Sequence, residues 1–298
     1  MTILVTGLSG FVGAHICPLV NAVDLGGSGR FVDLRDPAGV RQAVSRLSPT
    51  AVIHLAGQSS IGGAIENPME TYEVNFIGTL NLLNALRDAG FQGRFLYVGS
   101  AEVYGVVPET ELPVAENRTL QPQNPYAVSK VAAEALCYQW SQAGPFEIVM
   151  ARPFNHIGPG QTTRFAVADF AQQITRARMG KRDRILQTGD VDTTRDFTDV
   201  RDIARAYVSL LESGVNGEIY NVCSGVEKSL REVIAMLCKT AGVEMHIEVM
   251  PERLRSSDRR RMRGSFERLH SRTDWRPQIP LEKTLQDILN YWHTRESE

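Results

Sequence analysis

The stretch that decides the fold is TILVTGLSGFVG, residues 2–13, in a chain of 298 residues. Its β-branched and apolar beginning, 2–6, predicts a strand, and a helical pattern follows the last glycine. In a turn between a strand and a helix, Gly7 permits the tight bend, Gly10 lets the backbone approach a pyrophosphate, and Gly13 lets the helix pack on the strand. The helix N-terminus adds N–H groups for the anion. The pattern predicts a dinucleotide site, and a simple tight turn is the alternative.

Strands and helices alternate through the first half of the chain. Buried strands are predicted at 51–57, 95–98 and 146–151, and helices at 68–90 and 124–143. Right-handed crossovers between such strands give a parallel sheet with helices on both faces. We therefore expect an α/β fold, a Rossmann-type doubly wound parallel sheet with a smaller C-terminal α/β lobe. Ligands then bind at the carboxyl ends of the strands.

The region after the first helix is less regular. Pro18 should end or kink that helix early, and 21–30 is too short and glycine-rich for a regular second strand. The run 31–34 predicts the next strand, with Asp33 placed to accept a hydrogen bond from adenine; a solvated turn aspartate is the alternative. A carboxylate that closes the second strand normally selects NAD over NADP, and Asp24 is the candidate. The choice between NADH and NADPH stays open.

Two polar residues lie inside otherwise apolar elements. His54 belongs to a buried strand, so we expect a packed histidine rather than a base. Asn75 lies within the predicted helix 68–90, where a buried amide could tie adjacent strand ends together.

The run NPYAVSKVAAE, 124–134, predicts a helix with Pro125 in its first turn. Tyr126 and Lys130 are then one helical turn apart, so an ammonium can lie close to a phenol and lower its pKa from about 10. The strand before this helix ends near Ser100, which adds a hydroxyl. These three side chains could surround one carbonyl oxygen and pass it a proton. A surface helix with a tyrosine and a lysine by chance is the alternative.

Composition limits the classes of partner. The net charge of −2 and the pI near 6.3 give no general reason to expect nucleic acid or a membrane surface as a partner. There is no apolar run of membrane-spanning length and no signal peptide, so cytoplasmic residence is expected. The cysteines lack metal-ligand spacing, and we expect no metal and reduced core thiols at Cys17, Cys137, Cys223 and Cys238.

With these residues placed, the sequence resembles the extended short-chain dehydrogenase/reductases that act on nucleotide sugars. Besides the tyrosine and lysine pair, the segments that carry the resemblance are GLSGFVG from Gly7, HLAGQ from His54, VNFIGT around Asn75, SAEVYG from Ser100, RDFTDV from Arg195 and YNVCSG from Tyr220. The segment RPFNHIGPGQ, 152–161, is most similar to the GDP-6-deoxy-4-keto-mannose reductases that form GDP-D-rhamnose.

The resemblance implies an activity: NAD(P)H-dependent reduction of the 4-keto group of GDP-4-keto-6-deoxy-D-mannose. Tyr126 would protonate the 4-oxygen as nicotinamide delivers hydride to C4, Lys130 would hold the nicotinamide ribose, and Ser100 would bond the substrate oxygen. The predicted cofactor-binding residues are Gly7, Gly10, Phe11, Val12, Gly13, Asp33, Leu34, Leu55, Ala56, Gly57, Tyr126, Lys130, Pro153 and Phe154. The predicted substrate-binding residues are Ser100, Glu102, Asn155, Arg195 and Arg255. The configuration of the product at C4, rhamnose or talose, stays open.

The resemblance also implies an organisation into two lobes and a homodimer. The helices 68–90 and 124–143 are expected to pair with a second copy as a four-helix bundle. The RDFTDV helix and the YNVCSG strand are expected to belong with the main sheet. The predicted domains are a dinucleotide-binding domain of 1–155 and 194–223, and a nucleotide-sugar domain of 156–193 and 224–298.

Glu102 keeps a second activity open. Related 4,6-dehydratases place a glutamate two residues after the triad hydroxyl, where it removes the C5 proton, so the chain could be a GDP-mannose 4,6-dehydratase with Glu102 as a catalytic residue. A hydrogen bond from Glu102 to a sugar hydroxyl or a backbone amide is the other interpretation. A nucleotide-sugar 4-epimerase and a catalytically silent nucleotide-sensing protein are further alternatives.

Overall fold

The computed structural model describes residues 2–27, 31–254 and 260–298. Its centre is a six-stranded sheet of order β2-β1-β3-β4-β5-β9, in which every pairing is parallel. Its strands are β1 (Ile3–Thr6), β2 (Ala22–Val23), β3 (Ala51–His54), β4 (Arg94–Val98), β5 (Glu147–Pro153) and β9 (Ile219–Val222). The chain changes its direction across the sheet between β1 and β3, and ligands bind such sheets at this switch point. The predicted doubly wound parallel sheet is confirmed.

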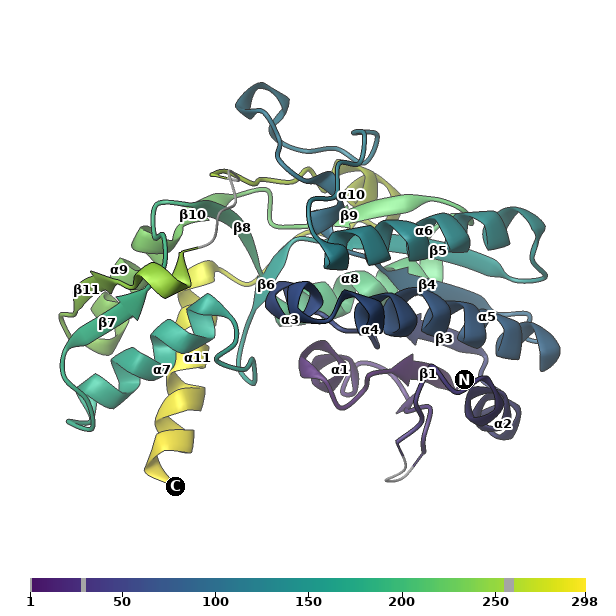
Figure 1. The fold of residues 1–298 in the computed structure, drawn as a ribbon, viewed down its shortest axis with the longest axis horizontal. Coiled ribbons are helices and arrows are strands. Elements are labelled where there is room, and N and C mark those ends of the chain that lie inside the picture. The colour runs from purple at the N-terminus through teal and green to yellow at the C-terminus, as the bar shows by residue number, and fades with distance from the viewer. Residues whose placement is uncertain (1, 28–30, 255–259) are drawn as a thin grey trace.

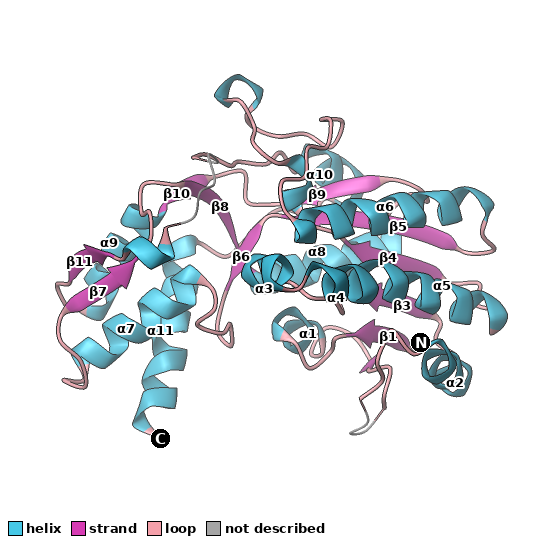
Figure 2. Cartoon of the chain, in the orientation of Figure 1, coloured by secondary structure: helices cyan, strands magenta, loops and turns pink. Residues whose placement is uncertain are grey.

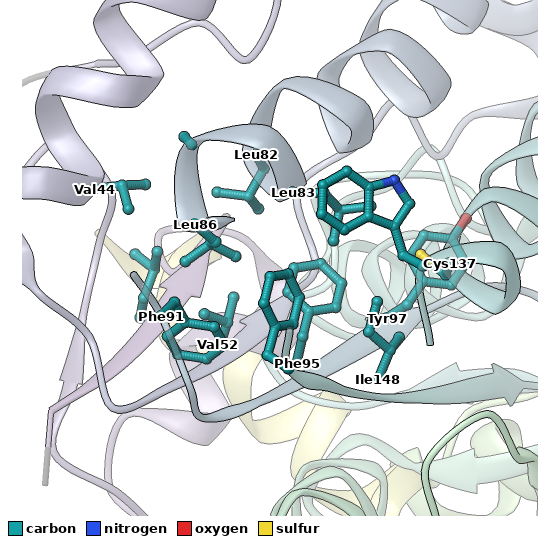
Figure 3. Close-up of a cluster of buried hydrophobic side chains, with 14 of the residues drawn as sticks. Val44, Val52, Leu82, Leu83, Leu86, Phe91, Phe95, Tyr97, Cys137 and Ile148 are labelled. Carbon is teal, nitrogen blue, oxygen red and sulfur yellow. The ribbon is translucent and has the colours of Figure 1, made fainter. Parts of the chain in front are cut away.

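Helices cover both faces of this sheet (Figure 1). One face carries α2 (Pro37–Leu47), α5 (Gly78–Asp88) and α6 (Pro125–Ala143), and the other carries α1 (Phe11–Ile16), α8 (Val200–Ser213) and α10 (Glu267–Thr273). Successive strand residues point to opposite faces. In β4, Phe95 and Tyr97 join the first cluster, which Figure 3 shows, whereas Leu96 and Val98 join the second.

The second half of the chain adds smaller sheets beside the main one (Figure 2). A three-stranded sheet has the order β10-β8-β6, and β7 pairs with β11. The strands are β6 (Asn155–Ile157), β7 (Ile185–Thr188), β8 (Thr194–Asp199), β10 (Glu227–Ser229) and β11 (His246–Val249). The helices α7 (Ala166–Arg178), α9 (Leu230–Ala241) and α11 (Leu281–Ser297) share a separate hydrophobic cluster with β6, β7, β8 and β11.

The predicted helix 68–90 is interrupted. It consists of α4 (Pro68–Tyr72), a π-helical turn η1 (Glu73–Ile77) and α5, and α3 (Ile61–Glu66) precedes it. Such π-turns are frequent at functional sites because they redirect side chains within a helix. The short 3₁₀ turns are η2 (Ala101–Tyr104), η3 (Glu109–Glu111) and η4 (Pro251–Arg253).

Two predictions around the second strand were wrong. A second strand does form at Ala22–Val23, although it is only two residues long and pairs with β1 alone. No strand forms at 31–34, because the chain turns there and the Asp33 carboxylate accepts a hydrogen bond of 2.9 Å from the Arg35 N–H. The first helix does end before Pro18, at Ile16.

RDFTDV is not a helix. Its first five residues, 195–199, lie in β8, which pairs with β6 and β10 rather than with the main sheet. The helix α8 begins only at Val200, because Asp199 caps it and accepts a hydrogen bond of 2.8 Å from Arg201 N.

The cysteines are free thiols, as expected. Cys137 and Cys223 are buried and Cys238 is half-buried, but Cys17 is exposed in the turn after α1, so the prediction of a core thiol was wrong there. Within the described ranges, none of the helices combines the length and the apolar character that a membrane span requires.

Candidate active site

The turn between β1 and α1 contains glycines at positions where the backbone packs closely. Gly7 has φ +75°, and a Cβ there would lie 3.1 Å from Ala56 N. A Cβ on Gly13 would lie 2.4 Å from Leu8 O, and Gly10 donates a hydrogen bond of 2.9 Å to Gly7 O. No side chain fits at Gly7 or Gly13, so the turn has the close-approach geometry that a pyrophosphate needs.

The residues after the turn contact the start of the second lobe. Phe11 and Val12 are half-buried at the beginning of α1. The Phe11 ring stacks on His156 at a centroid distance of 6.0 Å, and His15 Nε2 is 3.0 Å from Pro159 O. The glycine turn is therefore held next to the segment that follows β5.

The carboxyl end of β3 lies beside the glycine turn. Leu55 N donates to Thr6 O at 3.2 Å, and Ala56 N donates to Thr6 Oγ1 at 3.1 Å. A Cβ on Gly57 would lie 3.7 Å from Lys130 Nζ, so the predicted residues Leu55, Ala56 and Gly57 connect the turn to α6.

His54 is packed, as expected. Its ring nitrogens lie 2.7 Å from Thr6 Oγ1 and 3.0 Å from Thr79 Oγ1. Burial lowers the pKa of His54 to about 3, and the Lys130 charge adds to this effect. The imidazole is thus neutral at neutral pH and serves the fold.

Ser100, Tyr126 and Lys130 come together at the carboxyl end of β4. Ser100 follows this strand, and its Oγ accepts a hydrogen bond of 3.2 Å from Glu102 N. Tyr126 is buried, and the Ser100 side chain lies close enough to oppose the effect of burial on the Tyr126 pKa. Lys130 Nζ lies 5.9 Å from the centroid of the Tyr126 ring and donates to Val98 O at 3.0 Å.

The helix α6 begins where the sequence predicts. Asn124 caps it, with Oδ1 accepting a hydrogen bond of 2.8 Å from Ala127 N, and Pro125 occupies the first helical position. This start places Tyr126 in the first turn, next to the strand ends.

The expected lowering of the Tyr126 pKa was wrong. Burial raises the pKa of Tyr126 to about 12; the hydrogen bond with Ser100 opposes this effect, and the Glu102 charge adds to it. Burial also lowers the pKa of Lys130 to about 8. For the Tyr126 pKa, the effect of desolvation outweighs that of the Lys130 ammonium, because the Lys130 Nζ is directed to Val98 O. At neutral pH the phenol is protonated and can donate a proton.

The segment after β5 borders the same strand ends. Pro153 is the last residue of β5, and Phe154 N donates to Val222 O at 2.9 Å. The Phe154 ring is buried 6.3 Å from the Tyr104 ring, and a Cβ on Gly264 would lie 2.6 Å from Phe154 Cζ. Phe154 therefore packs into a hydrophobic cluster at this edge.

The predicted adenine contacts lie at the far side of the glycine turn. The Asp33 carboxylate pairs with Arg35, at 3.0 Å from Nε and 2.7 Å from Nη2, and this hydrogen bonding lowers the pKa of Asp33. Asp33 therefore makes the turn contacts that the sequence left as an alternative, and its contact with adenine stays a prediction. Leu34 is buried, and its carbonyl accepts a hydrogen bond of 2.8 Å from Asn81 Nδ2. An open pocket of about 490 Å³ lies beside them, lined in part by Phe31 and Arg46.

Two of the predicted substrate contacts, Asn155 and Arg195, lie in the three-stranded sheet. Asn155 opens β6 with an exposed side chain and pairs with Phe197 of β8, two residues along that strand from Arg195. Arg195 Nη1 donates to Thr194 O at 2.7 Å. Glu102 is half-buried in η2, and Arg255 lies outside the described residues.

The sequence prediction missed the charged groups beneath the site. Arg152 and Glu134 form a buried ion pair, with Nη2 and Oε1 2.6 Å apart. Asp196 is buried in β8 and accepts hydrogen bonds from the backbone N–H groups of Ser224, Gly225 and Gly264. Two features of the sequence could have indicated the ion pair: Arg152 lies inside an apolar strand, and Glu134 lies one helical turn after Lys130.

Comparisons with known proteins agree with this fold. The family model described as GDP-mannose 4,6 dehydratase matches residues 30–288. The chain is 46% identical to the GDP-6-deoxy-D-mannose reductase of Pseudomonas aeruginosa, over 98% of this chain and 97% of that protein. It is 30% identical to the GDP-6-deoxy-D-talose 4-dehydrogenase of Aggregatibacter actinomycetemcomitans, over 83% of each chain. The solved structure of RMD from Pseudomonas aeruginosa complexed with NADPH matches with a TM-score of 0.92 and 44% identity, over 99% of each chain.

The fold is that of the extended short-chain dehydrogenase/reductases. Within that class, the chain belongs to the GDP-mannose 4,6-dehydratase family, which its family match and its 46% identical relative both show. The resemblance inferred from the sequence is confirmed.

Proposed function

We propose that this protein reduces the 4-keto group of GDP-4-keto-6-deoxy-D-mannose with NAD(P)H and forms GDP-D-rhamnose. The observation that carries the proposal is the meeting of Tyr126, Ser100 and Lys130 at a strand edge beside the glycine turn. The 46% identical relative, named as a GDP-6-deoxy-D-mannose reductase, supports the choice of substrate.

The residues at the switch point fit a dinucleotide, because Gly7 bends the chain at φ +75°, Gly13 lets α1 pack against the Leu8 carbonyl, and Gly10 carries no side chain where the backbone would approach the pyrophosphate. Gly7, Gly10 and Gly13 would hold the pyrophosphate, the turn of Asp33 and Leu34 would lie at the adenine end, and Lys130 would bond the nicotinamide ribose. When bound, the reduced nicotinamide supplies a hydride to C4 of the sugar. NADPH in the similar solved structure supports a cofactor of this kind.

Tyr126 would donate the proton in the reduction. Its raised pKa keeps the phenol protonated at neutral pH, so a proton is present when the ketone oxygen gains charge. The Lys130 ammonium, 5.9 Å from the ring, stabilises the phenolate that forms. Ser100 lies close enough to Tyr126 to influence its pKa, and its hydroxyl would orient the ketone oxygen toward the phenol.

The nucleotide sugar would lie between the lobe of the main sheet and the smaller lobe, to which β8 belongs by its pairing with β6 and β10. Arg195 and Asn155 lie near each other in the register of β8 and β6. A guanidinium suits a diphosphate because its donors match the phosphate oxygens in pairs. We assign these two residues to the nucleotide diphosphate.

A homodimer through the helical face belongs to the same proposal. Large apolar side chains are exposed along α3, α4, η1 and α6: Ile65, Met69, Ile77, Val128 and Tyr138. Such a row of exposed apolar residues is typical of a surface that a second protein covers. The molar mass in solution tests this part, and a mass of a single chain would contradict it.

The experiment that tests the function supplies GDP-4-keto-6-deoxy-D-mannose with NADH or NADPH and identifies the product by NMR. The proposal expects oxidation of one of the two cofactors and a C4 configuration of GDP-D-rhamnose. A product with the talose configuration would correct the stereochemistry, and no reduction with either cofactor would overturn the proposal.

A further inference from the structure

A buried guanidinium joins three segments beneath the candidate active site. Arg152, 3% exposed, is the residue before Pro153 at the carboxyl end of β5. Its Nε and Nη2 donate to the two carboxylate oxygens of Glu134, at 2.8 and 2.6 Å. Its Nη1 donates to Tyr104 Oη at 2.8 Å and to Glu116 O at 3.1 Å. Each of the three guanidinium nitrogens thus donates at least one hydrogen bond.

Each partner of Arg152 belongs to a segment that also carries a site residue. Glu134 lies four residues after Lys130 on α6, on the same helical side. Tyr104 ends the 3₁₀ turn η2, which Ser100 opens. The guanidinium therefore connects the helix of Tyr126 with the turn of Ser100.

The network continues from Tyr104 into the sheet. The fully buried Tyr104 hydroxyl donates to Asn221 Oδ1 at 2.7 Å, and Asn221 N donates to Glu116 Oε1 at 2.8 Å. The Arg152 guanidinium also lies 4.9 Å from the Tyr104 ring centroid. Every hydrogen-bonding group of Tyr104 and of the ion pair has a partner, and such satisfied buried networks fix side chains in one arrangement.

We propose that Arg152, Glu134 and Tyr104 are positioning residues that set the distance between the Ser100 hydroxyl and the Tyr126 phenol. The proposal rests on the proposed function, in which those two groups meet one ketone oxygen. Arg152 and Glu134 lie in elements that also build the core, so substituting either of them would affect folding as well as positioning. The hydroxyl of Tyr104 can be removed while the ion pair is kept.

The test removes one hydroxyl and keeps the ion pair. In Tyr104→Phe, Arg152 retains both bonds to Glu134 and its bond to Glu116 O. The matched control is Tyr220→Phe, because Tyr220 is also buried and its hydroxyl accepts a single hydrogen bond, from Val215 N, away from the site. We expect Tyr104→Phe to lower kcat about tenfold with little change in KM or in NADPH affinity, because a small misplacement of reacting groups affects mainly the chemical step. Tyr220→Phe should keep the wild-type kcat.

A double-mutant cycle with Ser100→Ala separates positioning from a general structural role. If Tyr104 acts through Ser100, Tyr104→Phe should change kcat less than about twofold in the Ser100→Ala background. The same tenfold loss in both backgrounds, or an unchanged kcat in Tyr104→Phe alone, would overturn the inference.

The outcome also distinguishes this inference from the function itself. If Tyr126→Phe loses reduction while Tyr104→Phe is fully active, only the positioning role is wrong. If Tyr126→Phe keeps reduction, the proposed function is wrong, and the positioning role fails with it.

Discussion

Asn75 Nδ2 donates a hydrogen bond of 2.9 Å to the Oγ of Ser129, the residue directly before Lys130. The same amide accepts from Gln58 N at 2.8 Å and donates to Gln58 O at 3.0 Å. One side chain in the π-helical turn therefore ties the end of β3 to α6, and the tie expected between adjacent strand ends instead joins a strand end to a helix.

Asn75→Ala should destabilise the contact between the end of β3 and α6. The substitution leaves the backbone N–H and C=O of Gln58 without these partners, which costs about 2 kcal/mol in the free energy of unfolding. Weaker binding of NADPH should accompany it, because Gly57 precedes Gln58 in the predicted cofactor site. Urea unfolding and a cofactor titration measure both effects.

The control for that variant is Asn81→Ala, which removes a single bond, to Leu34 O. It should lose less stability than Asn75→Ala. Equal stability and equal cofactor affinity of Asn75→Ala and the wild type would show that the amide does not hold this edge.

Tyr126→Phe should lose reduction by about a thousandfold, because the proton donor is gone, while the buried ring remains. Cofactor affinity should stay nearly unchanged. Steady-state kinetics and fluorescence titration with NADPH check the two parts. A variant with more than about a tenth of the wild-type kcat would exclude Tyr126 as the donor.

Arg195→Ala should weaken binding of the nucleotide sugar about tenfold or more, since a charge-assisted hydrogen bond to phosphate is lost. Calorimetry with GDP measures the affinity directly. Arg231→Ala is the control, because Arg231 is an exposed arginine of the same half of the chain that pairs with Asp192. An affinity equal to that of the control removes Arg195 from the site.

Stability should fall on acidification because of His54. The native histidine takes a proton only near pH 3, whereas the unfolded chain takes one near its ordinary pKa of 6.5. Between these values the unfolded state binds more protons, so the free energy of unfolding decreases as the pH is lowered, by about 1.4 kcal/mol per pH unit. From about pH 7.5 to about pH 5 the contribution of this residue is about 2 kcal/mol.

Urea unfolding at the two pH values, with His54→Gln beside the wild type, isolates that contribution. The variant should show a smaller pH dependence than the wild type. The control His246→Gln replaces an exposed histidine and should leave the dependence unchanged. An identical dependence in His54→Gln and the wild type would refute the assignment.

The sequence was sufficient for the parts of the fold that rest on local patterns. The glycine turn, the helix that Asn124 and Pro125 begin, and the packed His54 each follow from neighbouring residues. The second strand was missed because its two residues are held by pairing with β1 rather than by their own pattern. RDFTDV became a strand for the same reason, since β6 and β10 supply its partners.

The site was predictable as a set of residues but not in its electrostatics. Spacing brings Lys130 to the face of Tyr126, yet the pKa of the phenol depends on burial by elements far apart in sequence. The network of Arg152, Glu134 and Tyr104 likewise forms only when β5, α6 and η2 meet. Tertiary contacts of this kind leave no pattern in one segment.

The most direct test of the proposed reduction measures whether the reduced cofactor is consumed. Purified protein is given GDP-4-keto-6-deoxy-D-mannose with NADPH, and separately GDP-mannose without any added reductant. A reductase oxidises one cofactor for each sugar reduced and leaves GDP-mannose unchanged, which is the result we predict. Conversion of GDP-mannose to the keto sugar without added reductant would contradict the account and show a dehydratase, with Glu102 as the candidate base.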